Sequence, residues 1–307
     1  MDGILVIDKP TGPTSHDIVQ KLRRILMQRK IGHAGTLDPL ATGVLPILLG
    51  KATKISRYLM GQDKAYEAEM CLGAKTDTLD AHGSFIEQND VHVSLADLIN
   101  SIKKFRGTIQ QIPPMYSAKK IAGKKLYELA RKGQTIERSA KDITIYDLEL
   151  LDFDYPRCRF YVKCSSGTYV RSLVDDIGQD LGCGAYLKAL RRVEVGPFKL
   201  AQALTLDAAE HQPEGLVQAL LSLRDALGTM PSIVLSPSLE RMICRGHQLS
   251  VADMSTLKMP KFARDEAILL KSTEGKALAV ARSVFACDAL LDVSMDERAL
   301  KTERVLI

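Results

Sequence analysis

The stretch 31–51 holds the residues in this 307-residue chain whose types and spacing could do chemistry. It reads IGHAGTLDPLATGVLPILLGK, in which Asp38 is the single acid among glycines, two prolines and two threonines. Glycine and proline at this density interrupt long regular elements, and Pro39 biases Asp38 towards an extended backbone. We therefore expect Asp38 on a constrained loop, where a rigid scaffold commonly presents catalytic groups. An aspartate before proline is also a common turn former, so both interpretations stand at this point.

Nearby patterns that suggest cofactor sites fail on their spacing. Six residues separate Gly43 from Gly50, and Ala52 follows Lys51, so the pattern of a triphosphate-binding loop is not met. The Gly182-Cys-Gly184 segment lacks the third glycine of a dinucleotide fingerprint. The six cysteines include no Cys-x-x-Cys pair, and the six histidines are not at ligand spacing beside them. We expect no metal, no cofactor and reduced cysteines.

Hydrophobic spacing predicts the elements that must position this loop. The apolar run before Lys9 predicts a strand over 3–8, and Thr14 or Ser15 can cap a helix that follows. Period-two alternation predicts strands over 66–72 and 143–164. Helical spacing predicts further helices from Ser94 onward and over 125–132, 169–181, 185–193 and 214–227. The mixture indicates an α+β fold.

Length and composition indicate two domains. The chain has 46% hydrophobic and 26% charged residues, which is typical of a globular protein with a substantial core. A turn-rich stretch after residue 228 separates a larger region, 1–228, from a small β-rich region, 238–307, with strand candidates over 267–271 and 277–285. No apolar run approaches the ~20 residues of a membrane span, and the start has no export-signal pattern. We expect a cytoplasmic protein.

Positive charge is concentrated in two segments of the chain. The whole chain carries a net charge of +5, whereas residues 1–60 alone carry +5 and residues 101–138 carry +8. Clustered lysine and arginine form the surface that phosphate groups require, so this distribution indicates a polyanion as partner. Solvated helix faces would produce a similar count, and charge alone does not separate the two interpretations.

The Asp38 segment resembles the signature of the TruB family of tRNA pseudouridine synthases, GHxGTLDPxATGxLP, without a gap. Other family motifs follow in order and together span about residues 3–207. His82 stands where the family commonly has an acid, a departure that we expect to affect only the surface. The further matching segments are Lys9-Pro10 with Thr14-Ser15, Asp63 to Tyr66, Thr76 to Asp80, Pro113 to Ala118, and Gly167 to Ser172.

This resemblance implies a role for each matched residue. Asp38 falls on the family's catalytic nucleophile, Tyr66 on the tyrosine that stacks against the target base, and Arg171 on the arginine that pairs with the catalytic carboxylate. The other matched residues are expected to bind substrate or support the site: His33 in base flipping, Tyr169 and Leu190 in the pocket lining, and Lys9, Lys64 and Asp80 as supports, with Asp80 in a salt-bridge network with Arg171.

The resemblance also implies the architecture and the partner. The family has a mixed and antiparallel sheet core with flanking helices, a basic RNA-contacting insertion, here about 101–138, and a PUA-like C-terminal domain, here 238–307. The implied substrate is the uridine at position 55, in the T arm of tRNA. We expect no cofactor, no obligate protein partner and a monomer.

The implied reaction suits these residue types. Isomerisation breaks the N-glycosidic bond and rejoins the uracil through C5 without redox change, and a paired guanidinium favours the ionised carboxylate that a nucleophile needs. The target base must leave its stack, and stacking on a ring such as Tyr66, Tyr169 or His33 returns about 1–3 kcal/mol. Attack at C6, attack at C1′ and a glycal route all remain open. So does a role for Tyr66 in removing the C5 proton.

Two other functions compete with the stand-alone enzyme. The first is a tRNA chaperone that uses the same basic surface and for which catalysis is dispensable. The second is a guided archaeal or eukaryotic relative that works inside a ribonucleoprotein. The basic segment 101–138 and the short C-terminal region favour the stand-alone bacterial type over this relative.

Overall fold

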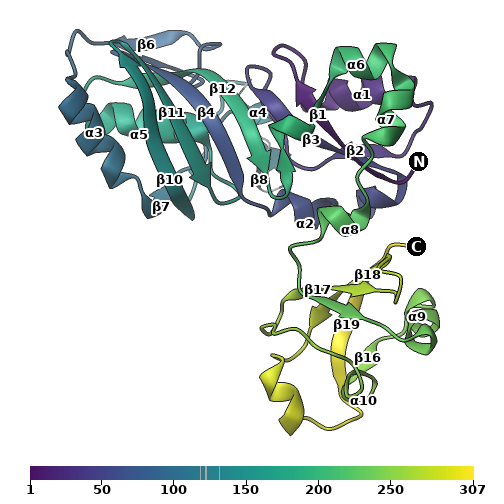
Figure 1. The fold of residues 1–307 in the computed structure, drawn as a ribbon. Helices are drawn as coiled ribbons and strands as arrows, with labels where there is room; N and C mark the ends of the chain where they lie inside the picture. The colour runs from purple at the N-terminus through teal and green to yellow at the C-terminus, as the bar shows by residue number, and fades with distance from the viewer. Residues whose placement is uncertain (118, 122, 131) are drawn as a thin grey trace.

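The larger part of the molecule is arranged on one mixed sheet (Figure 1). The computed structural model describes residues 1–117, 119–121, 123–130 and 132–307. The ten-stranded sheet has the order β14-β1-β3-β12-β4-β11-β10-β7, with β2 paired to β3 and β13 paired to β12. Neighbours are antiparallel except β1 with β14 and β3 with β12. The strands are β1 (Gly3–Lys9), β2 (Ile31–His33), β3 (Thr42–Leu49), β4 (Lys64–Leu72), β7 (Gly107–Gln111), β10 (Lys141–Asp154), β11 (Arg157–Cys164), β12 (Ala185–Val195), β13 (Phe198–Lys199) and β14 (Leu204–Thr205).

Helices pack at both ends of this sheet. In Figure 1, α3 and α5 lie at one end, where α3 packs on β10 and α5 packs on β12, whereas α1, α6 and α7 gather near β1 and β2. The predicted helix over 125–132 corresponds to α4, and residue 131 lies outside the described residues. The helices are α1 (Ser15–Ile25), α2 (Ser56–Met60), α3 (Leu95–Lys104), α4 (Leu126–Ala130), α5 (Val170–Asp180), α6 (Leu206–His211), α7 (Pro213–Gln218) and α8 (Leu223–Ala226). Two small ribbons complete this part: β5 (Ala74–Thr76) with β6 (Phe85–Gln88), and β8 (Lys120–Ile121) with β9 (Lys124–Lys125).

Helix α1 begins where its capping residues predict. The Asp17 amide donates to Thr14 Oγ1 at 3.1 Å, and the Thr14 amide donates to Asp17 Oδ2 at 2.9 Å, which forms a capping box. Ile18 and Leu22 are fully buried, as their helical spacing predicts. The first residue of the helix, Ser15, is buried and directed at the Asp38 loop: its hydroxyl donates to the Leu37 carbonyl at 3.0 Å and accepts from the Leu37 amide at 2.8 Å.

The helix predicted over 185–193 is wrong, because this segment is strand β12 in the centre of the sheet. Its pairing with β4 shifts register between Leu187 and Ala189 and again between Arg192 and Glu194. Such bulges interrupt strict alternation, so apolar residues fall at spacings of three that imitate a helix. Leu190 is consequently presented from a strand that neighbours both β3 and β4.

The single helix predicted over 214–227 is also wrong, because the segment forms two short helices, α7 and α8. Between them the Leu221 amide and carbonyl pair with the backbone of Ile4, each bond being 2.9 Å long. A new capping box of Ser222 with Asp225 then begins α8. This backbone pairing with β1 interrupts the helix. Hydrophobic spacing alone does not indicate the interruption.

A buried lysine anchors the loop that carries Asp38. Lys9, at the end of β1, is fully buried. Its ammonium donates to the carbonyls of Pro10 at 2.8 Å, Pro39 at 3.4 Å and Ala41 at 2.7 Å. Burial lowers the pKa of Lys9 to about 8, against the raising influence of Asp38. The Lys9 side chain thus fixes the backbone on the C-terminal side of Asp38, at Pro39 and Ala41.

The C-terminal part forms a second, five-stranded sheet of order β15-β17-β18-β19-β16. The predicted β-rich region is confirmed, with both strand candidates present and the second ending at Ser283; its PUA-like nature stays a prediction. The chain enters this sheet at β15, between the two predicted domains. The elements are β15 (Ser232–Val234), α9 (Pro237–Cys244), β16 (Leu249–Ser250), α10 (Val251–Met254), β17 (Ala267–Lys271), β18 (Ala277–Ser283) and β19 (Arg298–Val305).

A shared apolar cluster and an ionic group join the two parts. Ile55 and Leu59 of the larger part belong to one buried cluster with Val280 and Leu306 of the smaller part. Beside it, Glu303 accepts hydrogen bonds from the Tyr58 hydroxyl at 2.7 Å, from Arg282 Nε at 2.8 Å, and from Arg57. Burial opposes ionisation of Glu303, but Arg282 and Tyr58 outweigh it and hold the pKa of this carboxyl below its ordinary value.

Two further features bear on where the chain can work. Within the described ranges, no helix is both long and apolar enough to cross a membrane. All six cysteines are free thiols, and Cys158, Cys164 and Cys183 are buried.

Replacing Lys9 by methionine tests the anchoring of the loop. In K9M the carbonyls of Pro10, Pro39 and Ala41 lose their donor, so we expect the free energy of unfolding at about pH 7 to fall by about 1–3 kcal/mol. The folded-state pKa of Lys9, about 8, lies below its ordinary value of 10.5. Between these two pH values the unfolded chain therefore binds more protons than the folded protein. The wild type therefore gains stability relative to K9M as the pH rises from about 7 to about 9.5. Urea unfolding at both pH values measures this, and a constant or shrinking difference would contradict it.

The Glu303 contacts predict a second stability effect. E303Q leaves Arg57 and Arg282 without their carboxylate, so we expect the C-terminal part to dock less firmly, at a cost of about 1–3 kcal/mol. Limited proteolysis of the 228–236 connection should be faster than in the wild type. The control is E297Q, which alters an exposed glutamate of the same region. Equal cleavage rates in E303Q and E297Q would show that the ionic group does not hold the two parts together.

Candidate active site

Asp38 lies on the loop between β2 and β3, with its carboxylate against a buried arginine. Arg171 Nη2 is 2.8 Å from Asp38 Oδ2, and the side chains are 6% and 41% exposed, respectively. Arg171 is itself held by backbone carbonyls: Nη1 donates to Thr78 at 3.1 Å and Nη2 donates to Tyr116 at 2.7 Å. The pairing predicted from the resemblance is therefore present in the structure. The accessible Asp38 carboxylate thus lies in a charge-assisted contact with a fixed guanidinium.

Asp80 lies next to Arg171 of the Asp38–Arg171 pair. Its Oδ2 lies 3.7 Å from Arg171 Nε, and the residue is buried. Its Oδ1 accepts from the Thr78 hydroxyl at 2.7 Å and from the His82 amide at 3.0 Å. The His82 side chain is exposed, in agreement with the expectation that this departure from the family pattern affects only the surface.

Tyr66 and Leu190 lie on neighbouring strands and on one face of the sheet. In the pairing of β4 with β12, Tyr66 is opposite Arg192 and Ala68 is opposite Leu190. Tyr66 is 8% exposed and Leu190 is 9% exposed, and both belong to the same buried cluster. Burial raises the pKa of Tyr66 to about 12, so its hydroxyl is protonated at neutral pH.

His33 and Tyr169 lie at the ends of two elements near the Asp38–Arg171 pair. His33 is the last residue of β2, and Tyr169 immediately precedes α5. The Tyr169 amide donates to Gln111 Oε1 at 2.8 Å and its carbonyl accepts from Gln111 Nε2 at 3.1 Å. Burial, together with the charge of Arg192, lowers the pKa of His33, so this imidazole is neutral at pH 7. Its Nδ1 is buried and has no hydrogen-bond partner among the described residues. In the same part of the chain, neither ring forms a hydrogen bond with Asp38.

Lys64, the first residue of β4, bonds to the turn that leads into this strand. Its ammonium donates to the Met60 carbonyl at 2.7 Å and to the carbonyl of Gln62. Burial and the charge of Arg192 lower the pKa of Lys64 to about 8. Lys64 therefore fixes the backbone at Met60 and Gln62, ahead of the strand that carries Tyr66, and among the described residues it forms no hydrogen bond or ion pair with Asp38.

Sequence reasoning missed one residue of the site, Arg192. It is 1% exposed, and its guanidinium donates to the carbonyls of Val44 at 2.8 Å, Thr36 at 3.2 Å and Gly35 at 3.1 Å. The signal that could have found it is its spacing: in a strand, Arg192 lies two residues after Leu190 and therefore on the same face of the sheet. That signal was hidden because the segment was interpreted as a helix, on which an arginine has an exposed face available.

Two hollows lie next to the residues that form the site. One, of about 740 Å³, is lined by Thr78 and Tyr116, whose carbonyls hold Arg171, and by Ser172. The other, of about 370 Å³, is lined by Leu40 and Leu190. Among the described residues, no group of histidine, cysteine, aspartate or glutamate is placed to hold a metal ion.

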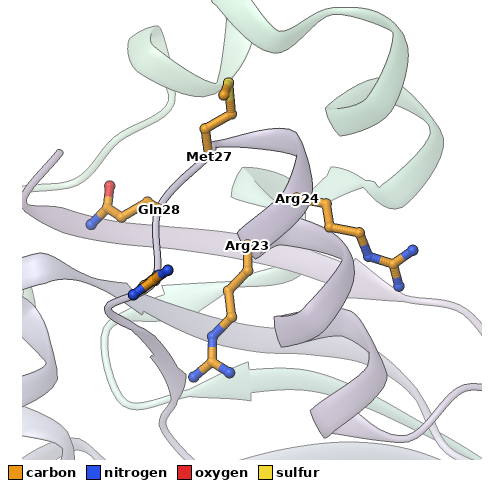
Figure 2. A pocket seen from close by; sticks show the side chains of 5 residues that line it. Arg23, Arg24, Met27 and Gln28 are labelled. Atoms are coloured by element: carbon orange, nitrogen blue, oxygen red, sulfur yellow. The ribbon is translucent and has the colours of Figure 1, made fainter.

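A third hollow, of about 530 Å³, lies away from Asp38, at the C-terminal end of α1. It is lined by three arginines with Met27 and Gln28. Figure 2 shows the side chains of Arg23, Arg24, Met27 and Gln28 pointing in different directions from the end of the helix. They do not converge on a common point, so this surface has no geometry for holding a small substrate.

Comparison with known proteins assigns nearly the whole first part of the chain. Residues 23–170 match the family model described as the N-terminal domain of TruB family pseudouridylate synthase. Residues 171–227 match the model described as the tRNA pseudouridylate synthase B C-terminal domain.

Curated relatives and solved structures agree with these matches. The chain is 50% identical over 241 residues to tRNA pseudouridine synthase B of Pseudomonas aeruginosa, covering 77% of this chain and 79% of the relative. It is 43% identical over 284 residues to the protein of that name from Burkholderia mallei, covering 92% and 93%. It also superposes on a chain in the crystal structure of a Cbf5-Nop10-Gar1 complex with a TM-score of 0.81 and 27% identity, covering 99% of this chain and 85% of that chain.

The level of identity and the coverage decide the family. A chain in the structure of an H/ACA RNP bound to a substrate RNA containing 2'-deoxyuridine is more distant, with 26% identity and a TM-score of 0.78 over 99% of this chain and 85% of that chain. The relatives at 43–50% identity match 77–92% of this chain and share one enzyme name. With the Asp38–Arg171 pair in place, the chain belongs to the TruB family of tRNA pseudouridine synthases.

Proposed function

We propose that the protein converts the uridine at position 55, in the T arm of tRNA, to pseudouridine, with Asp38 as the nucleophile. That it isomerises uridine to pseudouridine in tRNA follows from the family; the position and the role of Asp38 are our proposal. The observation that carries it is the accessible Asp38 carboxylate, 2.8 Å from the buried Arg171. This arrangement supplies an ionised nucleophile at a protein surface that a flipped base can reach.

The reaction needs only the groups that the site contains. The C1′–N1 bond breaks, the C1′–C5 bond forms, the C5 proton leaves and N1 gains a proton, so no oxidant or energy source is required. Asp38 attacks the uracil at C6 or the ribose at C1′, or assists a glycal route. In each case it must be unprotonated and close to the extruded nucleoside.

The rings and the basic surface account for binding. Tyr66 and Leu190, on adjacent strands, form an apolar floor on which the uracil stacks, and Tyr169 and His33 line its sides. The tRNA backbone binds the segment 101–138, whose described part includes the end of α3 and all of β7, and whose sequence carries a net charge of +8. The C-terminal domain, as a PUA-like domain, extends the RNA contact. We propose a cytoplasmic monomer that needs no protein partner.

Substitution of Asp38 tests this function. We expect D38N to release no tritium from a tRNA transcript labelled at C5 of uridine, while its RNA affinity stays close to that of the wild type, because the amide cannot act as a nucleophile. A transcript with cytidine at position 55 should give no release with the wild type. D90N, a change at an exposed aspartate, is the matched control. Tritium release that persists in D38N would refute the role of Asp38 as nucleophile. RNA binding without any release by the wild type would favour the function of a tRNA chaperone.

Substitution of Tyr66 tests the hypothesis that its hydroxyl takes part in removing the C5 proton. Y66F keeps the ring, so we expect RNA affinity to be retained while the single-turnover rate falls by about 100-fold or more. Because the pKa of Tyr66 is raised to about 12, ionised hydroxyl is scarce at neutral pH, and the wild-type rate should increase with pH in a way that Y66F does not. Rapid-quench measurements across the neutral range decide this. A full rate in Y66F would eliminate the role.

A further inference from the structure

Arg192 is a buried cation that is bound by backbone groups of the catalytic loop. It lies in β12 and is 1% exposed. Each of its three guanidinium nitrogens donates to a different carbonyl, those of Val44, Thr36 and Gly35, at 2.8, 3.2 and 3.1 Å. Among the described residues, no carboxylate lies within ion-pair distance of it. A buried charge without an ionic partner is costly, so packing alone does not account for an arginine at this position.

The three carbonyls flank Asp38 on the chain. Gly35 and Thr36 precede it, and Val44 follows it at the start of β3. Lys9 holds a different set, the carbonyls of Pro39 and Ala41. The planar fork of a guanidinium can hold several carbonyls in fixed relative positions, which an ammonium cannot do as rigidly. Because it bonds to carbonyls on both sides of Asp38, Arg192 holds the two ends of the loop in fixed positions relative to each other.

The backbone of Arg192 is fitted to the same loop. Gly43 pairs with Arg192 in the parallel register of β3 with β12. A Cβ atom added to Gly43 would lie 2.2 Å from the Arg192 carbonyl oxygen, and the φ of Gly43 is +99°. Only glycine allows this approach. The strand that leaves the loop is therefore in close contact with both the main chain and the side chain of Arg192.

The same guanidinium faces Tyr66 and Asp38. Tyr66 is opposite Arg192 across the β4–β12 pair. The guanidinium interacts through its charge with the Tyr66 hydroxyl and with the Asp38 carboxylate. The other charged groups around it, Lys9 at the end of β1 and Lys64 at the start of β4, repel it. Arg192 thus contacts the loop of Asp38 and lies opposite Tyr66.

We propose that Arg192 is a positioning residue for the isomerisation: it fixes the Asp38 loop through the Gly35, Thr36 and Val44 carbonyls and orients the Tyr66 hydroxyl. This inference rests on the roles of Asp38 and Tyr66 in the proposed function. It predicts that loss of the guanidinium lowers the chemical rate while RNA binding is retained, because misplacement of a reacting group by about 1 Å costs about 100-fold in rate.

The kinetic test compares R192M and R192K with R191M as the matched control. Arg191, the preceding residue of β12, forms a partly exposed ion pair with Asp8 at 2.7 Å. At saturating T-arm RNA we expect the single-turnover rate of R192M to fall by about 100-fold with little change in RNA affinity, and that of R191M to stay near the wild type. R192K should recover part of the rate, because it keeps the charge and some donors. A folded R192M with the wild-type rate would overturn the proposal. So would R192M and R192K proteins whose rate and RNA affinity fall in parallel with their melting temperature, since this would indicate general destabilisation.

A double-mutant cycle tests the link to Tyr66. If Arg192 acts partly through the Tyr66 hydroxyl, R192M should cost less in the Y66F background than in the wild type. Equal costs in both backgrounds would refute that link.

Hydrogen exchange provides a readout that does not depend on activity. We expect the amides of residues 34–44 to exchange faster in R192M than in the wild type, and those of R191M to be unchanged. This result stands even if the wild type fails to isomerise the target uridine, in which case the proposed function alone is refuted. Unchanged exchange of residues 34–44 in R192M would refute the positioning of the loop by Arg192.

Discussion

The backbone of the loop 34–41 must satisfy its polar groups although most of it belongs to no strand, and this constraint organises the centre of the molecule. Three buried side chains from different elements donate hydrogen bonds to this loop: Lys9 from β1, Ser15 from α1 and Arg192 from β12. Two of these side chains are cations, and burying a cation costs free energy. The result is a loop with little freedom that presents its one acid, Asp38, outward.

The sheet order then brings the remaining site residues together from distant parts of the sequence. Strands β3, β12 and β4 are neighbours, so the loop before β3 lies near Leu190 of β12 and Tyr66 of β4. Arg171 comes from the first turn of α5 and is held by the carbonyls of Thr78 and Tyr116. Because each of these side chains is fixed by backbone carbonyls or by packing, the site is organised before any RNA binds, as catalysis by positioning requires.

Local signals in the sequence predict much of this arrangement. Thr14 with Asp17 indicates the start of α1, and the alternation from Cys158 to Cys164 indicates strand β11. The Asp38–Arg171 pair was predicted through the resemblance of two motifs, because no local rule relates residues so far apart. Strand β12 was missed because its bulges disrupt the period of two. Arg192 was missed with it, and the contacts of Glu303 depend on how the two sheets of the molecule pack together, for which a sequence has no local pattern.

We propose above that Asp38, held by Arg171, acts on a uridine extruded from the T arm. A crystal structure of the D38N protein bound to a T-arm RNA would test this. We expect uridine 55 to be flipped out and stacked on Tyr66, with its C6 or C1′ about 3–3.5 Å from the side chain at position 38. A uridine that stays stacked in the RNA loop, or one bound in a hollow away from position 38, would contradict it.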